Sequence, residues 1–375
     1  MPAGVSLDLT VLTSVELVSL VAAQLDCRGL LALRAASRQA EPSATIVFQG
    51  RGAAVYVCGG GCGVGLGQDA LSCVERLDWD SGRWEAVAPM LQRRSGAAGA
   101  AIGGLLYVCG GGCAVSPAAL AAGRGGGDAE GSPPDGTVCV LRSAERFDPS
   151  TGLWEALPGM YESRRGAVAV AIAGRLLVCG GEGGECGEYV LSSAERFDPS
   201  TLAWESLPTM DGHRFGAAGA TLRGCVYVCG GSIGLDALSS AERFDPTSDC
   251  WETLPAMLEG RQGAAGVALA GHFYACGGWS VSRALVSVER FNPEVGVWEA
   301  LPHLALSEGL RLSSGASVAG CLILFGGQRE REGSVSDVQV VDPAAPPASQ
   351  ARSNCRRFPP MSQVRCAAVA MRILQ

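Results

Sequence analysis

The order of apolar and polar residues repeats along this chain in units of four short segments. Near residue 100 the first segment is made of small residues, "GAAGAAI", and the second, "LLYVCGG", is apolar up to a glycine pair that permits positive φ. The third, "AERF", alternates between apolar and polar side chains, "DPST" is typical of a type I turn, and "WEAL" follows. Each unit is therefore predicted to form four β-strands, with the small-residue strand nearest a crowded axis.

The glycine pair recurs through most of the chain at intervals of 47 to 70 residues. Its six copies are Gly59-Gly60, Gly110-Gly111, Gly180-Gly181, Gly230-Gly231, Gly277-Gly278 and Gly326-Gly327. Five copies continue to a tryptophan, seven residues after a leucine or phenylalanine of the third strand: Trp84, Trp154, Trp204, Trp251 and Trp298. In the degraded sixth copy, Phe358 stands where the tryptophan is expected. Because no unit buries both faces alone, the units are predicted to stack into a ring, with tryptophan and phenylalanine between neighbours.

A double glycine, an aromatic residue and a tryptophan seven positions later, at a period near fifty, resemble the kelch β-propeller family over roughly residues 50 to 375. The resemblance implies an all-β fold, a six-bladed kelch β-propeller in residues 43–375. The repeats begin on a second strand, "AAVYVCGG", and end on a first strand, "RCAAVAMRILQ", so the last strand is expected to complete the first blade. A competing candidate for that place is "TIVF" at residues 45–48.

Residues 1–42 precede the repeats and carry a helical pattern of apolar residues. The apolar positions are Leu17, Val18, Val21 and Leu25 on one face, then Leu30 and Leu31 after "DCRG". This α-helical segment is similar to an F-box, although Thr13 replaces the usual proline and no tryptophan follows Ser37-Arg38. The resemblance implies that these six residues bind the adaptor of a cullin-type ubiquitin ligase. The alternative is a helical lead-in that caps the propeller.

Arginine stands at the start of every predicted first strand, at Arg94, Arg164, Arg214, Arg261, Arg311 and Arg365. Because the strands of a blade alternate in direction, these positions share one face with the second-to-third loops, including the low-complexity insertion 112–138. Six arginines there predict a positive rim that binds acidic or phosphorylated segments, and arginines at matching positions contact acidic peptides in kelch receptors that this chain resembles. The other interpretation pairs each arginine with a glutamate of the "ER" strand: Glu145, Glu195, Glu242 or Glu289.

Composition narrows the possible partners. The formal net charge of −8 argues against binding to nucleic acid or to anionic membranes. The 16 cysteines, in a chain without a secretory leader, favour reduced thiols in the cytoplasm or nucleus. Five of them, at Cys58, Cys109, Cys179, Cys229 and Cys276, precede glycine pairs in apolar strands, where cysteine acts as a small buried hydrophobe. A metal or redox role is the minor alternative, with Cys62, Cys113 and Cys186 as its candidates.

No catalytic, metal or cofactor site is predicted. The three histidines, His213, His272 and His303, are scattered, and no Lys-Ser/Thr helix follows the glycine strings. The sequence therefore favours a non-enzymatic interaction protein, the substrate-recognition subunit of a cullin-type ubiquitin ligase. Two alternatives remain: a kelch scaffold for cytoskeletal or signalling partners, and a propeller enzyme.

Overall fold

The computed structural model describes residues 53–62, 70–114, 138–281, 283–330, 333–344 and 358–374. The chain divides into two units, Met1–Val47 and Phe48–Gln375, and every described residue belongs to the second unit. The expected F-box-like helices of residues 1–42 and the candidate strand at 45–48 therefore lie outside the described residues. In the described part of the chain, the single helix is the short 3-10 turn η3 (Pro302–Leu304), and no helix is long and apolar enough to cross a membrane.

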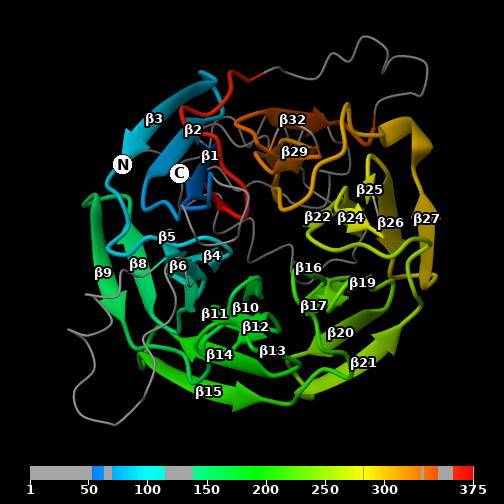
Figure 1. Ribbon diagram of the computed structural model, residues 1–375, viewed down its shortest axis with the longest axis horizontal. Coiled ribbons are helices and arrows are strands. Elements are labelled where there is room, and N and C mark those ends of the chain that lie inside the picture. The colour runs from blue at the N-terminus through cyan, green and yellow to red at the C-terminus, as the bar shows by residue number, and fades with distance from the viewer. Residues whose placement is uncertain are drawn as a thin grey trace, which may run out of the picture. The chain divides into compact units, whose positions relative to one another are not determined.

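Six antiparallel sheets form the blades of a propeller, as predicted (Figure 1). Blade 1 contains β33 (Val369–Leu374), β1 (Ala53–Cys58), β2 (Val74–Asp78) and β3 (Arg83–Val87). Blade 2 contains β4 (Ala98–Ile102), β5 (Leu105–Cys109), β8 (Ala144–Asp148) and β9 (Leu153–Leu157). Blade 3 contains β10 (Val168–Ile172), β11 (Arg175–Cys179), β14 (Ala194–Asp198) and β15 (Ala203–Leu207).

The second half of the ring follows the same order from inner to outer strand. Blade 4 contains β16 (Ala218–Leu222), β17 (Cys225–Cys229), β20 (Ala241–Asp245) and β21 (Cys250–Leu254). Blade 5 contains β22 (Ala265–Leu269), β23 (His272–Cys276), β26 (Val288–Asn292) and β27 (Val297–Ala300). Blade 6 has three described strands, β28 (Ser314–Val318), β29 (Cys321–Phe325) and β32 (Val338–Val341).

Short hairpins extend the loops between second and third strands at one end of the propeller. They are β6 (Gly112–Ala114) with β7 (Val138–Val140), β12 (Glu182–Gly183) with β13 (Tyr189–Val190), β18 (Ser232–Ile233) with β19 (Asp236–Ala237), β24 (Trp279–Ser280) with β25 (Arg283–Ala284), and β30 (Gln328–Arg329) with β31 (Gly333–Ser334). The connections that enter the inner strands pair with these hairpins, for example Arg165 with Glu182. We call this end of the propeller the hairpin face.

The last strand closes the ring. β33 pairs antiparallel with β1, so that Met371 lies opposite Tyr56. The inner strands β33, β4, β10, β16, β22 and β28 contact one another in this order around the axis, and β28 contacts β33. The prediction that the C-terminal strand completes the first blade is therefore confirmed.

Aromatic residues join neighbouring blades, as the repeat predicted. Within blade 3, Phe197 lies opposite Trp204, with ring centroids 5.1 Å apart. The same two rings pack with Tyr107 and other side chains of blade 2. The Trp204 indole N–H also donates a 2.8 Å hydrogen bond to the carbonyl of Pro158, which follows the outer strand of blade 2. Each tryptophan of the repeat thus supplies packing within its own blade and a polar contact to the preceding blade.

The structure corrects the predicted alignment of the sixth repeat at one position, Phe358. Trp84 donates its indole N–H to the carbonyl of Pro359, as Trp204 does to Pro158. Phe358, one residue earlier, therefore takes the place of Leu157 and not that of a tryptophan. Its ring packs against Trp79, with centroids 4.8 Å apart.

Candidate functional site

Five of the six predicted rim arginines are buried inside the blades. The exposed fractions are 0–2 % for Arg94, Arg164, Arg214, Arg261 and Arg365. Each forms an ion pair with the glutamate of the third strand of its own blade. The pairs are Arg94–Glu145 at 2.8 Å, Arg164–Glu195 at 2.9 Å, Arg214–Glu242 at 2.7 Å, Arg261–Glu289 at 2.8 Å, and Arg365–Glu75.

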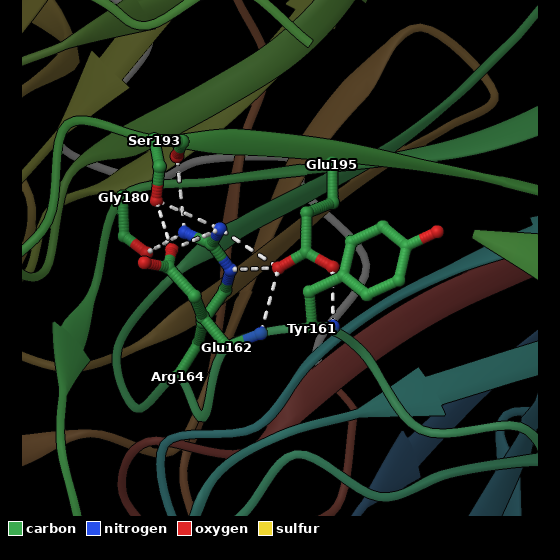
Figure 2. A network of polar contacts seen from close by, with 6 residues as sticks. All are labelled: Tyr161, Glu162, Arg164, Gly180, Ser193 and Glu195. Carbon is green, nitrogen blue, oxygen red and sulfur yellow. Dashed lines mark hydrogen bonds and ion pairs between the residues drawn. The ribbon is translucent and has the colours of Figure 1, made fainter. Parts of the chain in front are cut away.

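Figure 2 shows the hydrogen bonds and the ion pair made by one of these guanidinium groups, that of Arg164. Arg164 donates from Nε and Nη2 to Glu195 Oε1, at 3.1 and 2.9 Å. Its Nη1 donates to the carbonyls of Gly180 and Ser193, both at 3.0 Å. The second oxygen of Glu195 accepts the backbone N–H of Tyr161 at 2.7 Å. The pair therefore ties the glycine-pair turn, the third strand and the entry to the first strand into one network.

The burial of these five arginines corrects the prediction that they form a ligand-binding rim. A guanidinium that is 0–2 % exposed and already paired with a buried carboxylate is out of reach of a ligand on the surface of the propeller. Nη1 reaches the carbonyl of the first residue of the glycine pair in all five blades. The pairing interpretation describes these positions, and their role is structural.

The sixth arginine lies one residue out of register with the other five. Leu310, which is fully buried, occupies the arginine position of blade 6, because its carbonyl accepts the N–H of Gly278 as that of Arg261 accepts the N–H of Gly231. Gln339 replaces the partner glutamate and accepts the N–H of Ser307 at 3.2 Å. Blade 6 has thus exchanged the buried ion pair for an apolar residue and a neutral amide.

Arg311 itself lies half-buried on the hairpin face. Its guanidinium carbon lies 4.9 Å from the ring centroid of Trp279, which is a cation–π geometry. The two residues sit on adjacent bridges, Arg311 with Gln328 and Trp279 with Gln262. Among the described residues no carboxylate lies within ion-pair distance of Arg311. Of the six predicted arginines, Arg311 is therefore the one that has no carboxylate partner within the described part of the chain.

A closed circle of backbone hydrogen bonds surrounds the channel beside these residues. One residue from each blade donates its N–H to the carbonyl of its neighbour at 2.7–2.9 Å, through Gly96, Gly166, Gly216, Gly263, Leu312 and Ala367. All six have positive φ, between 49° and 66°. Four are glycines, which adopt this conformation without steric cost. The circle fixes the entry to every inner strand and so holds the hairpin face rigid at its centre.

Large apolar side chains stand exposed at the tips of three successive hairpins. The exposed fractions are 54 % for Tyr189, 49 % for Ile233, 97 % for Leu235 and 88 % for Val281. Val281 also has φ 48°, which is unusual for a β-branched residue. Backbone strain of this kind is concentrated where function requires a particular side chain in a particular place. The repeat does not mark these residues, and their signal in the sequence is an apolar residue inside a polar turn, as in "SIGLDA" and "WSVSRA".

The remaining candidate residues divide into two groups. The adaptor-binding candidates Leu17, Val18, Val21, Leu25, Leu30 and Leu31 lie outside the described residues. The five strand cysteines are buried as predicted, and burial raises the pKa of Cys109, Cys179, Cys229 and Cys276 to about 12. In the described part of the chain, no three His, Cys, Asp or Glu residues come together as a metal site.

Comparisons with known proteins agree with this architecture. The Kelch motif matches residues 54–91, 163–211, 213–258 and 260–305. The unmatched stretches contain the long loop of blade 2 and the altered blade 6, where the repeat departs most from its own pattern. No curated protein sequence matches the chain.

A solved structure, that of YjhT, is similar in fold. It superposes with a TM-score of 0.63 at 18 % sequence identity, covering 78 % of this chain and 94 % of that one. Sequence identity this low indicates a shared fold and carries no information about a ligand. The repeated Arg–Glu network, the ring of six blades and the matched segments together make this chain a six-bladed β-propeller that contains kelch motifs.

Proposed function

We propose that this protein is a non-enzymatic protein-interaction module that binds its targets through the hairpin face. The observation that carries the proposal is the set of exposed apolar side chains at the tips of three neighbouring hairpins: Tyr189, Ile233, Leu235 and Val281. Large apolar side chains that are exposed on neighbouring loops of one face are candidate contacts for another protein. Aromatic and aliphatic anchors of this kind supply most of the binding energy of protein interfaces.

Arg311 adds a polar recognition element to the same face. A guanidinium stacked on Trp279 is held in place before a ligand arrives, which lowers the entropic cost of binding. We therefore assign to Arg311 the role predicted for all six arginines, namely holding an acidic or phosphorylated segment of the target. The exposed Arg93 is a second cation at the corresponding entry to blade 2.

The second part of the proposal is that the N-terminal segment binds a ligase adaptor. Its similarity to an F-box supports a role as the substrate-recognition subunit of a cullin-type ubiquitin ligase in the cytoplasm or nucleus. Leu17 and Leu25 would dock into the adaptor, and the propeller would hold the target while the ligase modifies it. A kelch scaffold without a ubiquitin link would use the same hairpin face, so adaptor binding separates the two functions.

Target binding is tested with matched surface variants of the full chain. Ile233→Asp/Leu235→Asp and Arg311→Glu change the hairpin face, and Leu153→Asp places the same charge at a 68 % exposed position on the opposite end. Proteins captured from cell extract are quantified by mass spectrometry against wild type. We expect a set of proteins at least fivefold depleted on both hairpin-face variants and retained on Leu153→Asp. Identical capture by all variants would contradict the assignment of the face.

A further inference from the structure

Two cysteines face each other across one hairpin of the hairpin face. In β6 and β7 the register places Cys113 directly opposite Cys139, between the pairs Gly112–Val140 and Ala114–Val138. The two are 26 residues apart in the sequence, and both are half-buried thiols in the structure. Directly opposed residues of an antiparallel pair project their side chains to the same side of the ribbon.

Backbone hydrogen bonds show which type of pair this is. Gly112 uses both its N–H and its carbonyl to bond Ser95, and Val140 donates its N–H to the carbonyl of Glu185. Both residues thus direct these groups away from each other, which makes Gly112–Val140 a non-hydrogen-bonded pair. Pair types alternate along an antiparallel ladder, so Cys113–Cys139 is a hydrogen-bonded pair, for which the Cα atoms lie about 5.5 Å apart. This separation falls within the range of about 4.4–6.8 Å that disulfides span.

This pair differs from the cysteines that belong to the repeat. Cys109 and its equivalents fill the same buried strand position in blade after blade, where they pack as small hydrophobes. At the position of Cys113–Cys139, the other described hairpins carry Gly183–Tyr189, Ile233–Asp236, Ser280–Arg283 and Arg329–Gly333. Cys62 takes the place of Cys113 in blade 1, but none of these four hairpins carries a pair of cysteines, so the packing needs of the repeat do not explain the pair.

We propose that Cys113 and Cys139 form a reversible dithiol–disulfide site on the hairpin face, which a low-molecular-weight disulfide such as oxidised glutathione converts to the bridged form. The thiolate of one cysteine attacks a glutathione sulfur, forms a mixed disulfide and releases one glutathione thiolate. The thiolate of the other cysteine attacks the protein sulfur of that mixed disulfide, forms the Cys113–Cys139 bond and releases the second glutathione. Two protein thiols are oxidised, two protons are released, and one oxidised glutathione is reduced to two thiolates.

The surroundings of Cys113 set the pH dependence of the exchange. Burial raises the pKa of this thiol, whereas the charge of Arg94 and a hydrogen bond with Gln92 oppose the increase. The thiolate is the attacking species, so bridging is expected to accelerate as the pH rises from 7 to 9.

The test uses the folded full chain equilibrated in glutathione redox buffers. Samples are alkylated, digested without reduction and mapped by mass spectrometry. We expect one dominant cross-linked peptide that joins Cys113 to Cys139, about 2 Da lighter than the two thiol peptides combined. Cys113→Ser and Cys139→Ser should each stop at a glutathione adduct on the remaining cysteine. The control Cys250→Ser removes an exposed cysteine of blade 4 and should leave the cross-link intact.

Either of two results would overturn the proposal. One is stable glutathionylation of Cys113 or Cys139 in the wild type without the cross-linked peptide, which would place the sulfur atoms out of reach of each other. The other is cross-linking of these cysteines to Cys186 or Cys250 at comparable yield. The map of cross-linked peptides is meaningful only for folded protein. A far-ultraviolet circular dichroism spectrum of each variant therefore checks that the propeller is intact.

Discussion

Arg214 and Glu242 form a buried ion pair in blade 4, with Nη2 and Oε1 2.7 Å apart and both side chains at most 2 % exposed. Leu310 and Gln339 occupy the same two places in blade 6. The chain itself therefore contains both solutions to one packing problem. A buried ion pair is strongly coupled, because either charge without the other is left uncompensated in a medium of low polarity.

The first prediction concerns this coupling. Arg214→Leu should lower the free energy of unfolding by about 3–5 kcal/mol, because Glu242 then loses its buried partner. Arg214→Leu/Glu242→Gln reproduces the arrangement of blade 6 and should recover most of that loss. Urea unfolding followed by tryptophan fluorescence measures both. As a control, Arg243→Leu breaks the more exposed Arg243–Glu252 pair and should cost about 1 kcal/mol or less. A double variant as unstable as the single one would contradict this account.

The second prediction concerns the circle of backbone hydrogen bonds. Gly166 has φ 64°, and a Cβ there would lie 2.4 Å from Cε2 of Phe215. Gly152 has φ 72° and open space around it. Both alanine variants incur the left-handed backbone penalty, but Gly166→Ala should lose about 1–3 kcal/mol more, because it also overpacks a buried ring. Thermal unfolding of the two variants in parallel measures both losses of stability. Equal losses for Gly166→Ala and Gly152→Ala would argue against a circle that is fixed by steric contacts.

The third prediction concerns the turn at the outer end of blade 3. Hydrogen bonds from the hydroxyl and backbone N–H of Ser200 lower the pKa of Asp198 to about 2, with a smaller contribution from Arg175. The folded-state pKa lies below the unfolded value of about 3.9, so the stabilisation is fully present above pH 4 and is lost as the pH falls through 2. Ser200→Ala should raise this pKa, as measured by NMR titration of the carboxyl carbon. Asp245, whose pKa is lowered by Thr247, is the internal control and should not change.

The fourth prediction concerns thiol reactivity. Burial raises the pKa of Cys229 to about 12, so its thiolate is scarce at neutral pH and its sulfur is inaccessible. Cys250, in the same blade, is exposed. Maleimide labelling of folded protein at pH 7.5 should modify Cys250 rapidly and leave Cys229 intact until urea is added. Labelling of Cys229 at a similar rate would indicate that blade 4 opens readily.

The repeat made the fold predictable because every blade solves the same packing problem with the same residues. Strand number, the closing strand and the burial of the strand cysteines followed from periodic positions such as Phe197, Trp204 and Cys179. These positions are set by short-range alternation and by the need of each blade to cover its neighbour.

The candidate site was less predictable for the same reason. Recurrence in every blade pointed to the arginines, but a residue that recurs in this way serves the blade, as Arg164 does, and specificity resides where blades differ. Leu235, Val281 and the Cys113–Cys139 pair each occur in one blade only. The register shift at Arg311 was also hidden, because Leu310 and Arg311 are adjacent and only the hydrogen bond of Gly278 distinguishes their roles.

The most direct test of the central proposal is co-expression of the full chain with the F-box-binding adaptor of cullin ligases, followed by affinity capture. The wild type is compared with Leu17→Asp/Leu25→Asp, and Leu153→Asp in the propeller serves as the control for a surface charge. We predict stoichiometric adaptor with wild type and Leu153→Asp, and at least a tenfold loss with the double variant. Absence of adaptor from all three captures would contradict the ligase role and leave the scaffold function as the account of the hairpin face.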